Sequence, residues 1–187
     1  DQWGKEKQRR ISGKIMAAFY RNAVAMAQVY AAATGVRTYR PQNVNGNYRI
    51  GFNCNFYTPI DAKQRFILNI GVSNNFYRNI DLQSTELKVA ESSTVFTNYM
   101  ATPLSIEYNY KKIRIGSKFQ MAWHSARRKR KNFIDVNGVN IDAGIYGNVQ
   151  LPWNLQFATD FNYYAHRGFV NEVMNTDNFV WNAQLSK

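Results

Sequence analysis

From Tyr48 onward, apolar and polar residues alternate with a period of two, and this feature constrains the fold more than any other. Successive side chains of a β-strand point to opposite faces, so the alternation predicts strands with one apolar and one polar face. The clearest run sets Tyr48, Ile50, Phe52, Cys54 and Phe56 on the apolar face against Arg49, Gly51, Asn53, Asn55 and Tyr57 on the polar face. The sequence therefore predicts an all-β chain.

Similar runs recur along the chain and predict about eight strands in all. The other regular runs cover residues 66–72, 104–110, 113–123, 139–149, 153–161 and 179–185. Residues 1–46 are less regular: 11–20 can alternate as a strand, although their Ala and Met content also favours a helix. We expect a strand there, then a hairpin with its tip at 32–35 between 29–30 and 36–39, and a polar return over 41–46.

The predicted connections alternate between short and long. Short ones fall near residues 58–64, 111–112 and 150–152, and long ones near 77–102, 125–138 and 165–177. In an antiparallel up-and-down meander, alternate connections lie at opposite ends of the sheet. This predicts short turns at one end and long loops at the other, as in outer-membrane β-barrels, whereas the alternative is a soluble β-sandwich.

Strand length and aromatic placement also favour a transmembrane barrel. About ten residues at roughly 3.3 Å each, tilted near 45°, span about 23 Å, close to the apolar band of such a barrel. Aromatic residues near predicted strand ends fit the girdles expected at the two membrane interfaces: Tyr48, Phe56, Tyr110, Trp123, Trp153 and Trp181.

Composition narrows the class of protein further. Apolar residues make up 45% of the 187 residues and charged residues 19%, and no run is long and apolar enough for a membrane-spanning helix. The single Cys54 has no second cysteine to pair with, so we expect a small apolar side chain. The chain starts on Asp1 without a recognisable signal peptide, which predicts a mature or internal piece.

The net charge of +12 predicts attraction to a polyanion. The strongest local signal is the run Arg127, Arg128, Lys129, Arg130 and Lys131 in a predicted long loop. We expect it to contact lipopolysaccharide phosphates; a solvated loop or another polyanion are the alternatives. Four further basic residues on the polar face are expected to face a lumen, namely Arg49, Arg65, Arg114 and Lys118.

Catalytic signals are weak. His124 and His166 lie near predicted loop ends, with Asp160, Asp135 and Ser125 as conceivable partners, but no spacing brings them together. We expect no enzyme activity, no metal site and no cofactor.

Several segments resemble the TonB-dependent-receptor-like outer membrane β-barrel family. They are residues 34–47 (TGVRTYRPQNVNGN), 58–66 (TPIDAKQRF), 151–153 (LPW) and 178–186 (NFVWNAQLS). The resemblance runs from about residue 11 to the end and implies the C-terminal portion of a large barrel in the bacterial outer membrane. It also implies uptake of a large nutrient with energy from the TonB system, and a plug domain elsewhere in the parent chain.

Two departures from that family lead us to expect a fragment of a larger barrel, with residues 1–187 as one incomplete barrel region. The chain ends on Lys187 in mid-strand without a terminal aromatic residue, and eight strands are too few for the large barrel of that family. The rival is a closed eight-stranded barrel, in which 11–20 would pair with 178–187. A functional alternative is a soluble basic β-sheet module that binds nucleic acid or glycans. Our first expectation includes outer-membrane lipid and lipopolysaccharide as partners, and no nucleic acid.

Overall fold

A computed structural model describes residues 2–3, 8–85, 91–128 and 134–187. These residues form one large, mainly antiparallel sheet, which confirms the all-β prediction. Its strands are β1 (Gln2–Trp3), β2 (Arg9–Tyr20), β3 (Ala23–Ala31), β4 (Val36–Val44), β5 (Asn47–Pro59), β6 (Phe66–Thr85), β7 (Glu91–Tyr110), β8 (Ile113–Arg128), β9 (Val136–Gln150), β10 (Gln156–Arg167) and β11 (Asp177–Ser186). Two short 3-10 helices, η2 (Pro152–Asn154) and η3 (Glu172–Met174), lie in connections.

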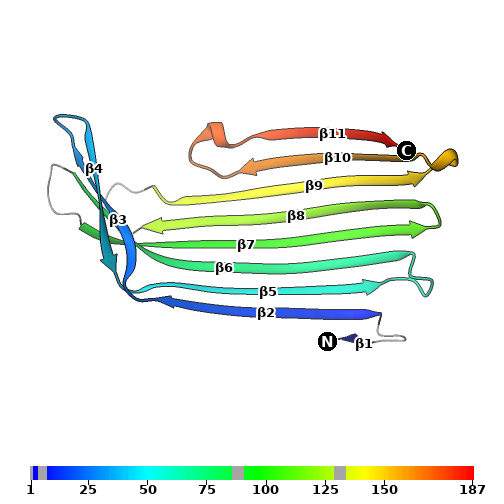
Figure 1. Cartoon of the computed structure of the whole chain (residues 1–187), viewed down its shortest axis with the longest axis horizontal. Helices are drawn as coiled ribbons and strands as arrows, with labels where there is room; N and C mark the ends of the chain where they lie inside the picture. The colour runs from blue at the N-terminus through cyan, green and yellow to red at the C-terminus, as the bar shows by residue number, and fades with distance from the viewer. Residues whose placement is uncertain (1, 4–7, 86–90, 129–133) are drawn as a thin grey trace.

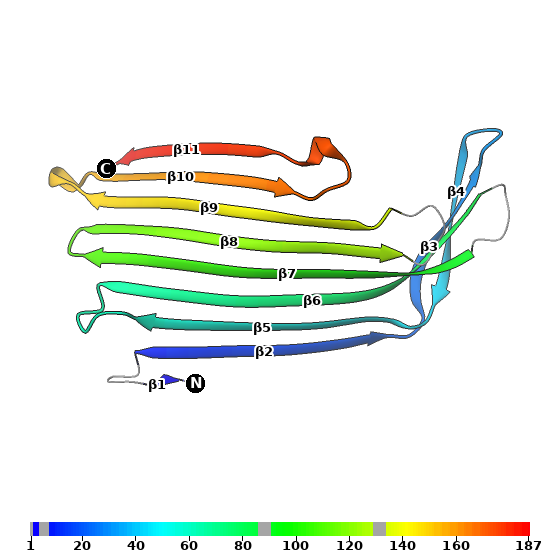
Figure 2. The same cartoon turned by 180° about the vertical axis from the view of Figure 1, so that it is seen from behind.

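Eight of the eleven strands form a meander in the order β2-β5-β6-β7-β8-β9-β10-β11. Figures 1 and 2 show it as a single layer, with the β3–β4 hairpin at one end, where β3 pairs in parallel with residues 83–85 of β6. The tight turns between β5 and β6, β7 and β8, and β9 and β10 lie together at one end (Figure 1). We call this the turn end and the opposite one the loop end. The predicted short turns at 111–112 and near 58–64 and 150–152 are confirmed.

The sheet does not close into a barrel. At one edge β2 pairs with β5 and, over two residues, with the short β1; at the other, β11 pairs with β10. The rival expectation that 11–20 pairs with 178–187 is therefore wrong. Residues 12–20 of β2 and Asp177–Ser186 of β11 are instead paired along only one side by the described strands.

The N-terminal segment adds a hairpin to the meander. The predicted strand at 11–20 is confirmed as β2, and so is the hairpin with its tip at 32–35. The polar return expected over 41–46 is wrong for 41–44, because β4 continues to Val44 and Pro41 pairs with Met26. The small core of the described chain lies here, where Ala27 and Val44 pack on Leu82 of β6.

Two of the predicted long loops are shorter than expected because the strands extend into them. The loop expected over 77–102 contains the end of β6 and the start of β7, and the one over 125–138 contains the end of β8 and the start of β9. Ser, Thr and Asn side chains remove the alternation there, but the backbone ladder continues, as in the pair of Ile80 with Thr94. The third long connection, between Arg167 and Asp177, is confirmed.

Candidate functional site

Cross-strand pairing divides the meander into two faces of opposite character. Directly paired residues share a face, so Ile50 of β5 lies beside Phe76 of β6, and Ile70 beside Leu104 of β7. The predicted apolar side chains thus form one continuous face, which we call the apolar face. No described strand forms a second layer over it, and many of its large side chains are exposed, among them Ile15, Phe19, Phe52, Ile70, Phe119, Ile145, Phe161, Phe179 and Trp181.

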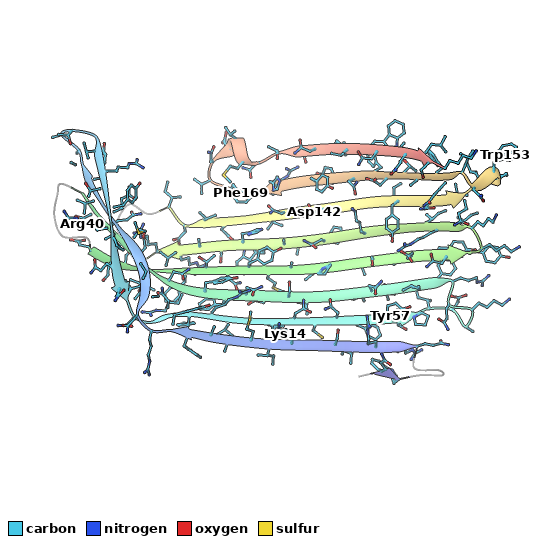
Figure 3. All side chains as sticks on the ribbon, in the orientation of Figure 1. Lys14, Arg40, Tyr57, Asp142, Trp153 and Phe169 are labelled. Atoms are coloured by element: carbon cyan, nitrogen blue, oxygen red, sulfur yellow. The ribbon has the colours of Figure 1, made fainter. Side chains whose placement is uncertain are left out.

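Charge follows the same division. Within the described residues of the eight strands, the apolar face carries Arg9 at the turn end and Arg78, Arg127, Arg167 and Asp177 towards the loop end. Among these described residues, no charged side chain lies between the two ends of that face. The polar face carries both signs along its length, at Arg10, Lys14, Arg49, Asp81, Glu91, Glu107, Arg114, Lys118, Arg128, Asp142 and Asp160. Lys14, Tyr57 and Asp142, labelled in Figure 3, belong to it.

Two threonine hydroxyls on the apolar face are bonded internally. The Thr159 hydroxyl donates to the backbone oxygen of Asn182 over 2.8 Å and accepts from the indole nitrogen of Trp181 over 3.0 Å. The Thr102 hydroxyl donates to the backbone oxygen of Met121 over 3.4 Å. These side chains therefore do not depend on water for their hydrogen bonds.

Aromatic rings gather near both ends of the apolar face. Towards the loop end, Phe19, Tyr48, Phe76 and Phe96 form a chain of ring contacts with centroid separations of 6.0, 6.1 and 5.9 Å. Towards the turn end, the ring pairs are Trp3 with Phe56, Phe66 with Tyr108, and Tyr108 with Tyr110. The expectation for Trp181 is wrong, because it lies in mid-strand opposite Phe161.

The polar face is hollowed at its centre. A cavity of about 630 Å³ is lined by residues of seven adjacent strands, from β2 to β10. Its polar-face lining is Arg10, Ser12, Asn55, Tyr57, Asn69, Gly71, Pro103, Ser105, Lys118, Gln120, Asp142, Asn162 and Tyr164. Amide, hydroxyl and charged groups thus surround a space able to hold water or a polar partner.

The four basic residues expected on the polar face occupy different surroundings. Arg49 donates to Asn75 over 2.8 Å and lies 5.1 Å from the ring centre of Tyr77, while its buried Nε has no hydrogen-bond partner among the described residues. Lys118 lines the central cavity.

Arg114 and Arg65 are held by carboxylates near the turn end. Glu107 accepts hydrogen bonds from Arg114, Asn109 and the Tyr146 hydroxyl over 2.7, 2.6 and 2.8 Å. Arg65 lies in the turn before β6, where its Nε donates to Asp61 over 2.8 Å. That hydrogen bond, helped by another from the Phe66 amide, holds the pKa of Asp61 below its usual value.

The basic run is not one patch. Arg127 lies on the apolar face, is exposed, and makes no ion pair or hydrogen bond within the described residues. Arg128 lies on the polar face, where it pairs with Asp81 and donates to Ser93 over 2.7 Å. Lys129, Arg130 and Lys131 lie outside the described residues.

The two histidines, which sequence spacing did not connect, share one partner. His124 lies 3.0 Å from the Asn140 amide nitrogen, and His166 lies 2.7 Å from the Asn140 amide oxygen. Ser125 faces the opposite side of the sheet, and Asp160 is bonded to Asn162 and Asn182. Asn140 was missed because its role depends on the register of β8, β9 and β10.

Among the described residues, no three His, Cys, Asp or Glu side chains gather in a way that would hold a metal ion. The described part of the chain also contains no helix with the length and apolar character needed to cross a bilayer. Comparison with protein family models, curated protein sequences and solved structures gives no match to this chain.

Proposed function

We propose that this chain is part of the wall of a bacterial outer-membrane β-barrel, with its apolar face in hydrocarbon and its polar face towards a water-filled or plugged lumen. The observation that carries the proposal is the exposed apolar face, which lacks charged side chains between its two ends within the described residues. Hydrocarbon tolerates such a face, whereas a charged side chain at the midplane of a bilayer is costly.

Burial within the chain supports the same proposal. No large side chain of the described residues is fully buried, while Ile15 is 85% and Trp181 72% exposed. Soluble monomers rarely expose continuous apolar patches larger than a few hundred Å². A soluble basic sheet would therefore need a second layer over this face, whereas lipid supplies that cover directly.

The dimensions fit as well. Ile113 begins β8 at the turn end, and Trp123 lies ten residues further along the same face. Ten residues rise about 33 Å along the strand, or about 23 Å across the membrane at a 45° tilt, against an apolar band of about 25 Å. Trp123 would then lie at the far interface, a position typical of Trp in membrane proteins.

The open edges favour a larger assembly. Unpaired backbone groups in hydrocarbon cost several kcal/mol each, so a sheet in a membrane must close. We propose that further strands of the parent protein pair with β2 and β11. The resemblance described above implies the rest: a TonB-dependent receptor, with a plug domain elsewhere in the parent chain, that takes up a large nutrient.

Cell fractionation tests the membrane proposal. The parent protein should sediment with outer membranes, resist extraction by salt and carbonate, and dissolve in detergent. Its folded form should migrate differently from its boiled form on a denaturing gel. Recovery as a detergent-free soluble protein that binds RNA or a glycan resin would support the soluble alternative and contradict the proposal.

The uptake role needs a separate test. The test uses a nutrient on which cells grow only when this gene is intact. Growth on that nutrient should also be lost when the gene for TonB is deleted. Unchanged growth without TonB would contradict the uptake role and leave the membrane proposal standing.

A further inference from the structure

A second hollow, of about 660 Å³, lies on the apolar face towards the loop end. Its lining comes from three adjacent strands: Asn74 and Phe76 of β6, Phe96 and Asn98 of β7, and Trp123, Ser125 and Arg127 of β8. Its volume is within the range of pockets that hold small molecules. We call it the outer hollow.

The outer hollow combines apolar walls with free polar groups. The rings of Phe76 and Phe96 are stacked with their centroids 5.9 Å apart. The Asn98 oxygen accepts a hydrogen bond from Asn74 over 2.9 Å, but the Asn98 amide nitrogen and the Ser125 hydroxyl donate none within the described residues. This contrasts with Thr102 and Thr159, two hydroxyls on the same face that are bonded internally.

Positive charge is concentrated at this level. Arg78, Phe96 and Arg127 occupy one cross-strand row, so the two arginines flank the Phe96 ring. Strands two positions apart in a sheet lie about 10 Å apart, so one ligand can reach both cations. Arg78 is bonded to the Gly46 oxygen, whereas Arg127 is exposed and unpaired within the described residues.

The depth of the outer hollow in the membrane indicates which part of the membrane supplies its ligand. Ser125 lies twelve residues beyond Ile113 on the same face, about 28 Å across the membrane at a 45° tilt. That is just outside an apolar band of about 25 Å, where headgroups lie. The loop end of an outer-membrane barrel faces outward, so these headgroups belong to the outer leaflet.

We infer that the outer hollow binds the phosphorylated glucosamine headgroup of lipopolysaccharide, an inference that rests on the proposed function. Arg127 pairs with a phosphate, for which its planar guanidinium is well suited. The aromatic rings pack against the apolar faces of the sugar, and Asn98 and Ser125 donate to its oxygen atoms. Arg127 is the member of the basic run that borders the acyl chains, whereas Arg128 pairs with Asp81 on the polar face.

Lipid binding to the purified parent protein in detergent tests this inference. The probes are bisphosphorylated lipid A, the same lipid after removal of both phosphates, and phosphatidylglycerol. We expect the native protein to prefer bisphosphorylated lipid A over both other lipids. Arg127→Gln should weaken lipid A binding about tenfold, as expected for loss of one charge-assisted hydrogen bond. Lys118→Gln removes the same charge from the polar face and should leave binding unchanged.

Three results would overturn the inference: equal binding of the two forms of lipid A, equal binding of lipid A and phosphatidylglycerol, or no effect of Arg127→Gln. The native protein and both variants are fractionated in parallel. Outer-membrane localisation without a lipid A preference would contradict this inference alone, whereas absence from the outer membrane would contradict the proposed function.

Discussion

Replacing Ile70 by arginine tests the depth and the direction of the apolar face together. Ile70 pairs with Leu104, which lies six residues from Tyr110 at the turn end. Six residues rise about 20 Å along the strand, or about 14 Å across the membrane, which is close to the middle of a 25 Å band. Arginine at the midplane of a barrel wall costs about 2–4 kcal/mol.

Two matched variants separate depth from direction. Ile113→Arg places the same charge on the same face at the turn end, where the expected cost is about 0–1 kcal/mol. Asn69→Arg places it on the polar face, where Asn69 now bonds Ser105 over 3.3 Å, and should be mild. The assay is guanidinium unfolding of the parent protein in phospholipid vesicles, followed by tryptophan fluorescence.

The result that would refute the reasoning is specific. Ile70 is already 45% exposed, so if its face met water, Ile70→Arg would change the free energy of unfolding by less than about 0.5 kcal/mol. Equal effects of Ile70→Arg and Asn69→Arg would show that the two faces do not meet different solvents.

Two further predictions concern the turn end. An added Cβ at Gly116 would lie 2.3 Å from the Tyr146 ring, so Gly116→Ala should destabilise the parent protein by about 1–3 kcal/mol in guanidinium unfolding; the control Gly147→Ala has 4.0 Å of clearance and should be nearly neutral. The pKa of Asp61 in the folded protein is lowered by its hydrogen bond from Arg65. That bond therefore stabilises the fold at pH values above the pKa of Asp61 in the unfolded chain, and the stabilisation is lost as the pH falls through the pKa in the folded protein. Asp61→Asn should therefore reduce the acid dependence of unfolding, and an unchanged pH profile would contradict this assignment.

The alternation of side chains was enough to predict the two faces of the sheet. Each regular run corresponds to a strand, apart from residues 153–155, which lie in and beside η2 ahead of β10. The apolar members lie together because directly paired residues share a face. The same rule, continued through β8, would have placed Arg127 and Arg128 on opposite faces. Treating them as members of one charged loop hid that difference.

Other features depend on information that a single strand does not carry. Past the aromatic rings near the loop end, polar side chains occur on both faces of the strands. The extension of β6 to Thr85 therefore leaves no alternation of apolar and polar residues in the sequence. The shared bonding of His124 and His166 to Asn140 is set by the register of three strands. The outer hollow likewise depends on how β6, β7 and β8 are aligned.

A spin-label scan along residues 117–121 of β8 tests the central claim most directly. Single cysteines are introduced in a Cys54→Ser background of the parent protein in lipid vesicles. Labels at Ser117, Phe119 and Met121 should be accessible to oxygen dissolved in the lipid and shielded from a water-soluble nickel chelate. Labels at Lys118 and Gln120 should show lower oxygen accessibility. Nickel accessibility at the first three positions, or immobile labels there with low access to both reagents, would contradict the account.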